Sequence, residues 1–157
     1  STLMRSSAAS DVYKRQIKPS TLTKCIHVSQ PWEEVHPRVN EGAFVIKHKG
    51  VYYMTYSGNS YESPFYGIGY ATASSPMGPW TKYSGNPILQ KPDSLVGVGH
   101  SAMFKDKEGQ MKIVYHAHKN KEEIHPRYMC ISTVHFTNDT VPVMQIGNDI
   151  LKPAEEE

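Results

Sequence analysis

The stretch Ala43-Phe44-Val45-Ile46-Lys47-His48-Lys49-Gly50-Val51-Tyr52-Tyr53-Met54-Thr55-Tyr56-Ser57 carries the clearest structural signal in this sequence of 157 residues. It contains a short apolar segment, a polar turn that ends in Gly50, and a second segment rich in aromatic residues. Glycine at the end of such a turn supplies the positive φ that a tight hairpin requires. The stretch therefore predicts two antiparallel strands, at 43–47 and 51–57.

The same pattern returns 59 positions later in the chain. The matching positions are an alanine, a glycine and a tyrosine: Ala43 with Ala102, Gly50 with Gly109, and Tyr56 with Tyr115. This register predicts strands at 102–105 and 110–116. A third strand is predicted after each hairpin, near 66–74 and 127–136, and a fourth edge strand near 80–83 and 141–146.

Four antiparallel strands repeated at such an interval are typical of the blades of a β-propeller. Glycine and proline interrupt nearly every window that could show helical periodicity, so helices are not expected. The predicted class is all-β, with about two to three four-stranded blades of a propeller that this chain is too short to close. The alternative is a small β-sandwich in which two similar hairpins arise by chance.

Composition excludes several other classes of protein. Hydrophobic residues make up 38% of the sequence and charged residues 20%, which is ordinary for a folded domain. The sequence has no apolar run near the ~20 residues of a membrane-spanning helix. Cys25 and Cys130 are too few for a disulfide framework, and the sequence lacks a P-loop, a dinucleotide fingerprint and a nucleophile elbow.

Residues 6–16 look like the in-frame translation of a sequencing-library adapter. We therefore set residues 1–16 aside as a non-native leader and assign residues 17–157 to the propeller. The leader carries Arg5, Lys14 and Arg15 against Asp11, which accounts for the whole net charge of +2. The rest sums to zero, so neither a nucleic-acid partner nor a membrane is expected. Because the leader replaces the natural N-terminus, the sequence assigns no compartment.

The repeat also predicts where chemistry would lie. The innermost strand of each propeller blade lines a central channel, and the 59-residue offset puts Glu41 and His100 at equivalent places where two such strands begin. Two ionisable residues at a channel mouth form a candidate active site. Glycines beside them, in 40–42 and 97–100, would let the backbone approach a ligand closely.

At these residues the chain resembles glycoside hydrolase family 43, whose members are five-bladed β-propellers. The resemblance covers roughly residues 17–146 and implies that the chain is a C-terminal part of such a propeller. The stretches that carry it are Val39-Asn40-Glu41-Gly42-Ala43-Phe44, Gly50-Val51-Tyr52-Tyr53-Met54-Thr55-Tyr56-Ser57, Gly67-Ile68-Gly69-Tyr70-Ala71-Thr72-Ala73, Ser75-Pro76-Met77-Gly78-Pro79-Trp80, Gly97-Val98-Gly99-His100-Ser101 and Ile113-Val114-Tyr115-His116-Ala117.

The resemblance implies roles for individual residues. Glu41 matches the family's general acid, and His100 matches a central histidine that in many members coordinates calcium directly or through water. His100 could instead hold a water without any metal. Arg127 matches an arginine that reaches the substrate pocket, although pairing with a carboxylate would make it structural. We also expect substrate contacts from Asn40 and from the aromatic Tyr66, because sugar rings stack on aromatic faces; the loop at 59–65 is the other candidate.

The implied activity is inverting hydrolysis of arabinofuranosyl or xylosyl bonds in plant-type glycans, with a carbohydrate as partner and calcium as the expected cofactor. The family's general base and a second aspartate lie on two blades that would precede Glu41. Upstream, this sequence offers only Asp11, Glu33 and Glu34, and none sits in an expected motif. This chain alone is therefore predicted to be inactive. The alternatives are a non-catalytic carbohydrate-binding propeller, a fructan hydrolase and a glycoside phosphorylase.

Overall fold

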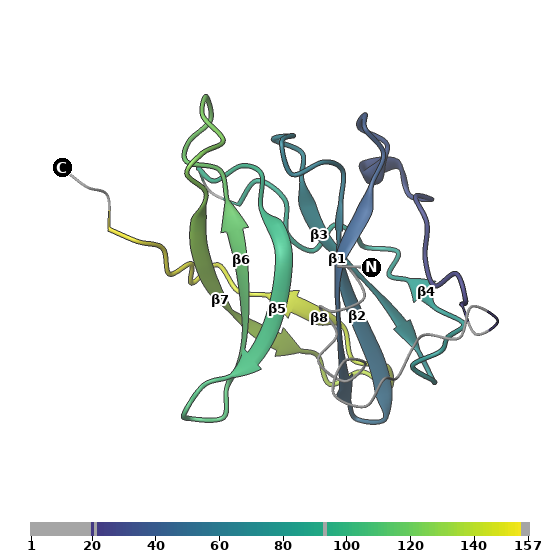
Figure 1. Ribbon diagram of the computed structural model, residues 1–157. Coiled ribbons are helices and arrows are strands. Elements are labelled where there is room, and N and C mark those ends of the chain that lie inside the picture. Colours follow the sequence, from purple (N-terminus) through teal and green to yellow (C-terminus); the bar gives the residue numbers. More distant parts are fainter. Residues whose placement is uncertain (1–19, 21, 93, 155–157) are drawn as a thin grey trace, which may run out of the picture.

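The structure, a computed structural model, describes residues 20, 22–92 and 94–154. The leader predicted at 1–16 lies outside these residues. The described part consists of two four-stranded antiparallel sheets that lie side by side (Figure 1). Among the described residues, no helix is long and apolar enough to cross a membrane.

The first sheet, here the first blade, has the strand order β1-β2-β3-β4, and the second blade has the order β5-β6-β7-β8. Among the named strands, each pairs with its neighbours in sequence, so each sheet is a meander of the kind that builds propeller blades. The predicted all-β class and blade pattern are confirmed. The strands are β1 Asn40–His48, β2 Val51–Gly58, β3 Gly67–Ala73, β4 Thr81–Lys82, β5 Gly99–Lys105, β6 Met111–Ala117, β7 Tyr128–Phe136 and β8 Met144–Ile146.

The two inner hairpins form as the glycine pattern predicts. Gly50 and Gly109 end the β1–β2 and β5–β6 turns with φ of 83° and 80°. No heavy atom outside the chain neighbours would lie within 4 Å of a Cβ at either position, so it is the backbone conformation that favours glycine there. The predicted edge strands are shorter than expected, because β4 has two residues and β8 three.

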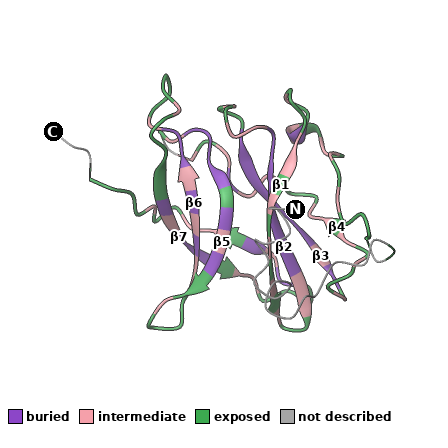
Figure 2. Cartoon of the chain, in the orientation of Figure 1, coloured by how far each residue is buried: buried purple, intermediate pink, exposed green. Residues whose placement is uncertain are grey.

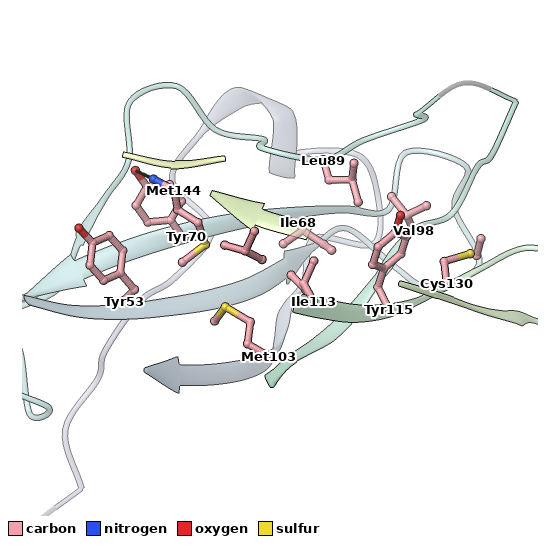
Figure 3. Packing of buried hydrophobic residues seen from close by; sticks show 12 residues of the cluster. Tyr53, Ile68, Tyr70, Leu89, Val98, Met103, Ile113, Tyr115, Cys130 and Met144 are labelled. Atoms are coloured by element: carbon pink, nitrogen blue, oxygen red, sulfur yellow. Dashed lines mark hydrogen bonds between the residues drawn. The ribbon is translucent and has the colours of Figure 1, made fainter. Parts of the chain in front are cut away.

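The hydrophobic core lies where the two blades face each other. Figure 3 shows Ile68 and Tyr70 of the first blade packed towards Met103, Ile113 and Met144 of the second. All five side chains are at most 6% exposed. Figure 2 shows this burial along β2, β3 and β5, with the exposed residues gathered at the strand ends and the outer faces. The packing between blades therefore joins buried residues of both sheets in one hydrophobic cluster.

A segment ahead of β1 crosses the first blade and includes a short 3-10 helix, η3 (Pro31–Glu33). The indole of Trp32 lies on two glycines: a Cβ at Gly58 would come within 2.6 Å of it, and one at Gly69 within 2.8 Å. Asn59, which is fully buried, holds the same segment, because its amide group donates to the carbonyls of Trp32 and Phe65. We call residues 27–39 the strap.

The strap carries a buried ion pair. Glu33 is fully buried, and its carboxylate lies 2.6 Å from the Lys82 ammonium group on β4. The carboxylate also accepts hydrogen bonds from the Tyr56 hydroxyl at 2.6 Å and from the backbone N–H groups of Ser29 and Gln30. Burial works to raise the pKa of Glu33, but these donors outweigh it and hold the pKa below its ordinary value. Glu33 therefore stays ionised and joins the strap to the sheet.

We expect Lys82→Met to lower the free energy of unfolding by about 3–5 kcal/mol, because it leaves the Glu33 carboxylate buried without its cation. Denaturant unfolding at neutral pH measures the change. The matched control is Lys107→Met, whose side chain is 89% exposed and whose loss should cost at most about 0.5 kcal/mol. A loss in Lys82→Met no larger than in the control would contradict a stabilising role for this ion pair.

Candidate active site

Both innermost strands are interrupted by a β-bulge near their start. The register of β1 against β2 shifts between Glu41 and Phe44, and that of β5 against β6 shifts between Gly99 and Ala102. The residues with positive φ inside the two bulges are Gly42, at 61°, and His100, at 53°. The 59-residue alignment is therefore wrong by one position here: His100 corresponds to Gly42, not to Glu41. Both bulges add one residue to their strand, so they do not cause this difference. Lys105 pairs with Met111 where Lys47 pairs with Tyr52, so the β5–β6 turn is one residue longer than the β1–β2 turn and all of β5 is shifted by one position relative to β1.

The two bulges meet where the blades adjoin. A Cβ on Gly42 would lie only 3.2 Å from the Cα of His100, so Gly42 allows both the positive φ and the close approach of the second blade. The backbone N–H of His100 donates to the Ser57 hydroxyl oxygen at 2.7 Å. His100 is thus held at the contact between blades, with its side chain exposed on the side predicted to face the channel.

Glu41 is exposed, and its carboxylate has one described hydrogen-bond donor. The Tyr66 hydroxyl donates to its Oε1 at 2.9 Å, across a sequence separation of 25 residues. Tyr66 itself is fully buried. Burial and the neighbouring Glu41 carboxylate raise the pKa of Tyr66 well above its ordinary value, so the hydroxyl keeps its proton and remains a donor.

The glycines of 97–100 make room for protein side chains. A Cβ on Gly99 would lie 2.1 Å from the Tyr66 ring, and one on Gly97 would lie 2.1 Å from the His118 ring. The sequence suggested that glycines here would admit a ligand. In the structure, Tyr66 and His118 occupy this space instead. With no side chain at Gly99, the Tyr66 ring can pass over β5 and stack on His116, with the ring centroids 5.5 Å apart and an interplanar angle of 13°.

Arg127 is exposed at the end of the β6–β7 loop. Its Nη1 lies 3.0 Å from Nε2 of His116, and its guanidinium lies 4.9 Å from the centroid of the Tyr61 ring. A guanidinium has no acceptor, so Arg127 donates and Nε2 of His116 accepts. The neutral imidazole therefore carries its proton on Nδ1. The alternative prediction was that Arg127 pairs with a carboxylate and has a structural role. Among the described residues, Arg127 makes no ion pair with a carboxylate within 4 Å.

His116 is a site residue that the sequence did not single out. Burial and the positive charges of Arg127 and His100 lower the pKa of His116 to about 4. Its buried Nδ1 approaches the Gly97 backbone without reaching normal hydrogen-bond geometry with any described residue. In the sequence, the one sign of His116 is its place beside Tyr115 in the repeated strand. A histidine at such a place is as often a packing residue as a site residue.

Asn40, predicted as a substrate contact, has its side chain engaged within the protein. Its Oδ1 accepts a hydrogen bond from Lys82 at 2.8 Å, and its Nδ2 donates to the Val39 carbonyl. The ion pair between Glu33 and Lys82 therefore reaches the residue directly before Glu41. Glu33 was not expected at the site, because no family motif surrounds it in the sequence.

An open pocket of about 690 Å³ lies against the second blade on this side. His100 and the loop that carries Arg127 line it, together with His116 and His125. Calcium prefers six to eight oxygen ligands, and no group of three potential ligands from His, Cys, Asp and Glu occurs among the described residues. The described residues around His100 therefore do not form a calcium site by themselves. Arg127, His116 and Glu41 are instead linked through Tyr66, in an arrangement suited to a polar ligand.

Comparison with known proteins agrees with this geometry. The sequence profile of the glycosyl hydrolases family 43 matches residues 9–142, starting inside the predicted leader. The chain belongs to this family. An endo-1,4-β-xylanase structure from Bacteroides thetaiotaomicron is 43% identical, with a TM-score of 0.81 over 87% of this chain and 47% of that one.

Two further relatives are similar over a shorter stretch. A β-D-galactofuranosidase of Aspergillus niger is 33% identical over 98 residues, which are 61% of this chain and 28% of that protein. An extracellular exo-α-(1→5)-L-arabinofuranosidase of Streptomyces avermitilis is 31% identical over 106 residues, 62% of this chain and 22% of that protein. The matched part thus spans less than a third of either relative.

The low pKa of His116 predicts a pH-dependent stability. The imidazole has a pKa near 6.5 when unfolded and about 4 when folded. Between these values the unfolded chain binds the extra proton, so the free energy of unfolding should fall as the pH drops from 6.5 to 4. Urea unfolding across this range measures the slope. His116→Phe should reduce it and the exposed control His135→Phe should not; equal slopes in His116→Phe and the unsubstituted chain would contradict the prediction.

Proposed function

We propose that the protein containing this chain is a glycoside hydrolase that cleaves arabinofuranosyl or xylosyl units from plant-type glycans by a single displacement. The observation that carries the proposal is the placement of Glu41: an exposed carboxylate at the start of an innermost strand, bonded to a tyrosine hydroxyl. Family membership and the furanosidase and xylanase names of the relatives support the substrate class.

In this proposal Glu41 is the general acid. It protonates the oxygen of the leaving sugar as the glycosidic bond breaks, which removes the need to expel an alkoxide. An inverting mechanism also needs a carboxylate base that activates a water on the opposite face of the sugar. Of the two described carboxylates upstream of Glu41, Glu33 is buried in its ion pair with Lys82, and Glu34 lies on the strap in an exposed pair with Arg38. The base would come from outside this chain.

Arg127 would bind hydroxyl groups of the sugar, because its guanidinium is exposed and has N–H groups beyond the one given to His116. His100 would face the same space and hold a water, or supply one ligand to a calcium ion whose other ligands lie outside this chain. The side-chain oxygen of Asn40 is bonded to Lys82, and the Tyr66 hydroxyl is bonded to Glu41. In this arrangement the two residues would support the site without contacting the substrate through these groups.

We expect the 157-residue chain by itself to be inactive. Without a base, the attacking water is not deprotonated, and the loss of such a group typically costs about 10²–10⁴-fold in rate. The assay is the release of nitrophenol from aryl α-L-arabinofuranoside and β-xyloside by the purified chain. Turnover that survives further purification and disappears in Glu41→Gln would show that the chain carries its own base.

Glu41→Gln tests the acid assignment in the complete reading frame that contains this chain. The variant should lose about 10²–10⁴-fold in kcat/KM on substrates with poor leaving groups, which need the proton most. The loss should be much smaller on aryl substrates with acidic leaving groups. The control is Glu108→Gln, an exposed carboxylate in the β5–β6 turn. Full activity of Glu41→Gln on both substrate types would overturn the assignment.

The substrate panel should also include galactofuranosides and fructans, with and without phosphate as acceptor. Binding of oligosaccharides without hydrolysis of any panel member would favour a non-catalytic carbohydrate-binding propeller. Phosphate-dependent cleavage would favour a phosphorylase, and cleavage of fructans alone a fructan hydrolase.

A further inference from the structure

We propose that Tyr66 and His116 form a positioning pair that fixes the acid Glu41 on the first blade relative to Arg127 on the second. The inference rests on the proposed function, since it assigns these two residues to the same site. In the structure, four side chains make a continuous path, from Glu41 through the Tyr66 hydroxyl and ring to His116 and then to Arg127.

The first link orients the acid. Glu41 is exposed on β1, so without a partner its carboxyl group would sample several rotamers. The Tyr66 hydroxyl donates to one carboxylate oxygen, Oε1, at 2.9 Å. Because the tyrosine ring is fully buried, this donor has little freedom to move. The other oxygen, Oε2, has no protein donor among the described residues and can face a leaving group.

The second link orients the arginine. Nε2 of His116 accepts a hydrogen bond from Nη1 of Arg127. A neutral imidazole is required for this bond, because a protonated ring has no acceptor. The low pKa of His116 meets that requirement at neutral pH. The Tyr61 ring below the guanidinium restricts Arg127 further.

The stack between Tyr66 and His116 connects the two links across the blades. Tyr66 precedes β3 in the first blade, and His116 lies on β6 in the second. The stack of their rings therefore fixes the Tyr66 hydroxyl, which holds Glu41, relative to Nε2 of His116, which holds Arg127. The space for the stack depends on Gly99, where a Cβ would collide with the tyrosine ring.

Other buried tyrosines differ from Tyr66 in the partner of the hydroxyl. Tyr53, which is also fully buried, donates to the backbone carbonyl of Pro142. Tyr115 bonds with the buried Ser132 hydroxyl. Tyr66 donates instead to an exposed carboxylate at the candidate site. Tyr53→Phe is therefore a matched control, because it removes a hydroxyl from an equally buried ring of the same blade without touching the site.

Tyr66→Phe tests the first link in the complete reading frame, because it keeps the stacked ring and removes the hydroxyl group, which also contacts Ser57. A hydrogen bond to a charged group corresponds to about ten- to a hundredfold in rate, so kcat should fall by that factor on a substrate with a poor leaving group. On an activated aryl substrate, kcat should change less than about twofold, because little proton donation is needed there. Tyr53→Phe should leave kcat unchanged on both substrates. An equal loss on both substrates, or no loss on either, would overturn the proposal.

His116→Phe tests the second link, because it keeps an aromatic ring for Tyr66 and removes the acceptor for Arg127. KM should rise by about tenfold while kcat changes little, which marks a loss of uniform substrate binding. His116→Gln should restore part of the affinity, since its side-chain oxygen can accept from Arg127. An unchanged KM in His116→Phe would overturn the role of this residue.

A readout that needs no catalysis separates failure of this pair from failure of the proposed function. The side-chain carboxyl ¹³C resonance of Glu41, assigned with Glu41→Gln, should move in Tyr66→Phe and stay in place in Tyr53→Phe. If the intact protein hydrolyses nothing but this resonance moves as expected, the proposed function fails and the Tyr66 contact stands. A resonance that does not move in Tyr66→Phe overturns the pair whatever the activity.

Discussion

The contact between the two bulges is the constraint on which the rest of the site depends. Gly42 and His100 both adopt positive φ, and the backbones approach so closely that a methyl group on Gly42 would crowd His100. A bulge turns the side chain next to it out of the regular alternation of a strand. The exposed side chains of Glu41 and His100 lie at these bulges, near the start of the two innermost strands.

The site is assembled from both blades and from the strap, so its geometry is tied to their packing. Lys82 links the buried Glu33 carboxylate to Asn40, and Asn40 leads directly into Glu41. Tyr66 links Glu41 to the second blade through the His116 ring. The Glu33 carboxylate and the Tyr66 ring are fully buried, so the polar bonds that they make are strong and their loss is costly.

Much of the fold could be predicted from the sequence, because the signals that specify a blade are local. Turn glycines at 50 and 109, with apolar and aromatic residues on the strands beside them, define the inner hairpins, and the repeat then indicates a second blade. The edge strands were overestimated, since pairing at an edge depends on tertiary contacts that β propensity does not encode. The one-position error at His100 arose because the β5–β6 turn is one residue longer than the β1–β2 turn, so the 59-residue offset that relates β2 to β6 does not hold between β1 and β5.

The candidate site was predicted in part. Family motifs point to Glu41, His100 and Arg127, and the structure brings Glu41 and Arg127 into one network while His100 lies beside it. Tyr66 was expected to meet a sugar as an aromatic surface, and the structure buries it beneath Glu41. His116 and Glu33 were missed, since a lone histidine in a strand and a lone glutamate after Pro-Trp resemble ordinary packing and surface residues.

The sequence by itself determined the class of fold, the number of strands in each blade and the residues with chemical potential at the strand entrances. These features follow from interactions between residues close in the chain, such as the turn that joins β1 to β2. Only the tertiary structure decided which polar groups meet. The Tyr66 hydroxyl reaches Glu41 across 25 residues, and Lys82 reaches Glu33 across 49. Such contacts depend on side-chain directions and blade packing, which exist only once the sheets have come together.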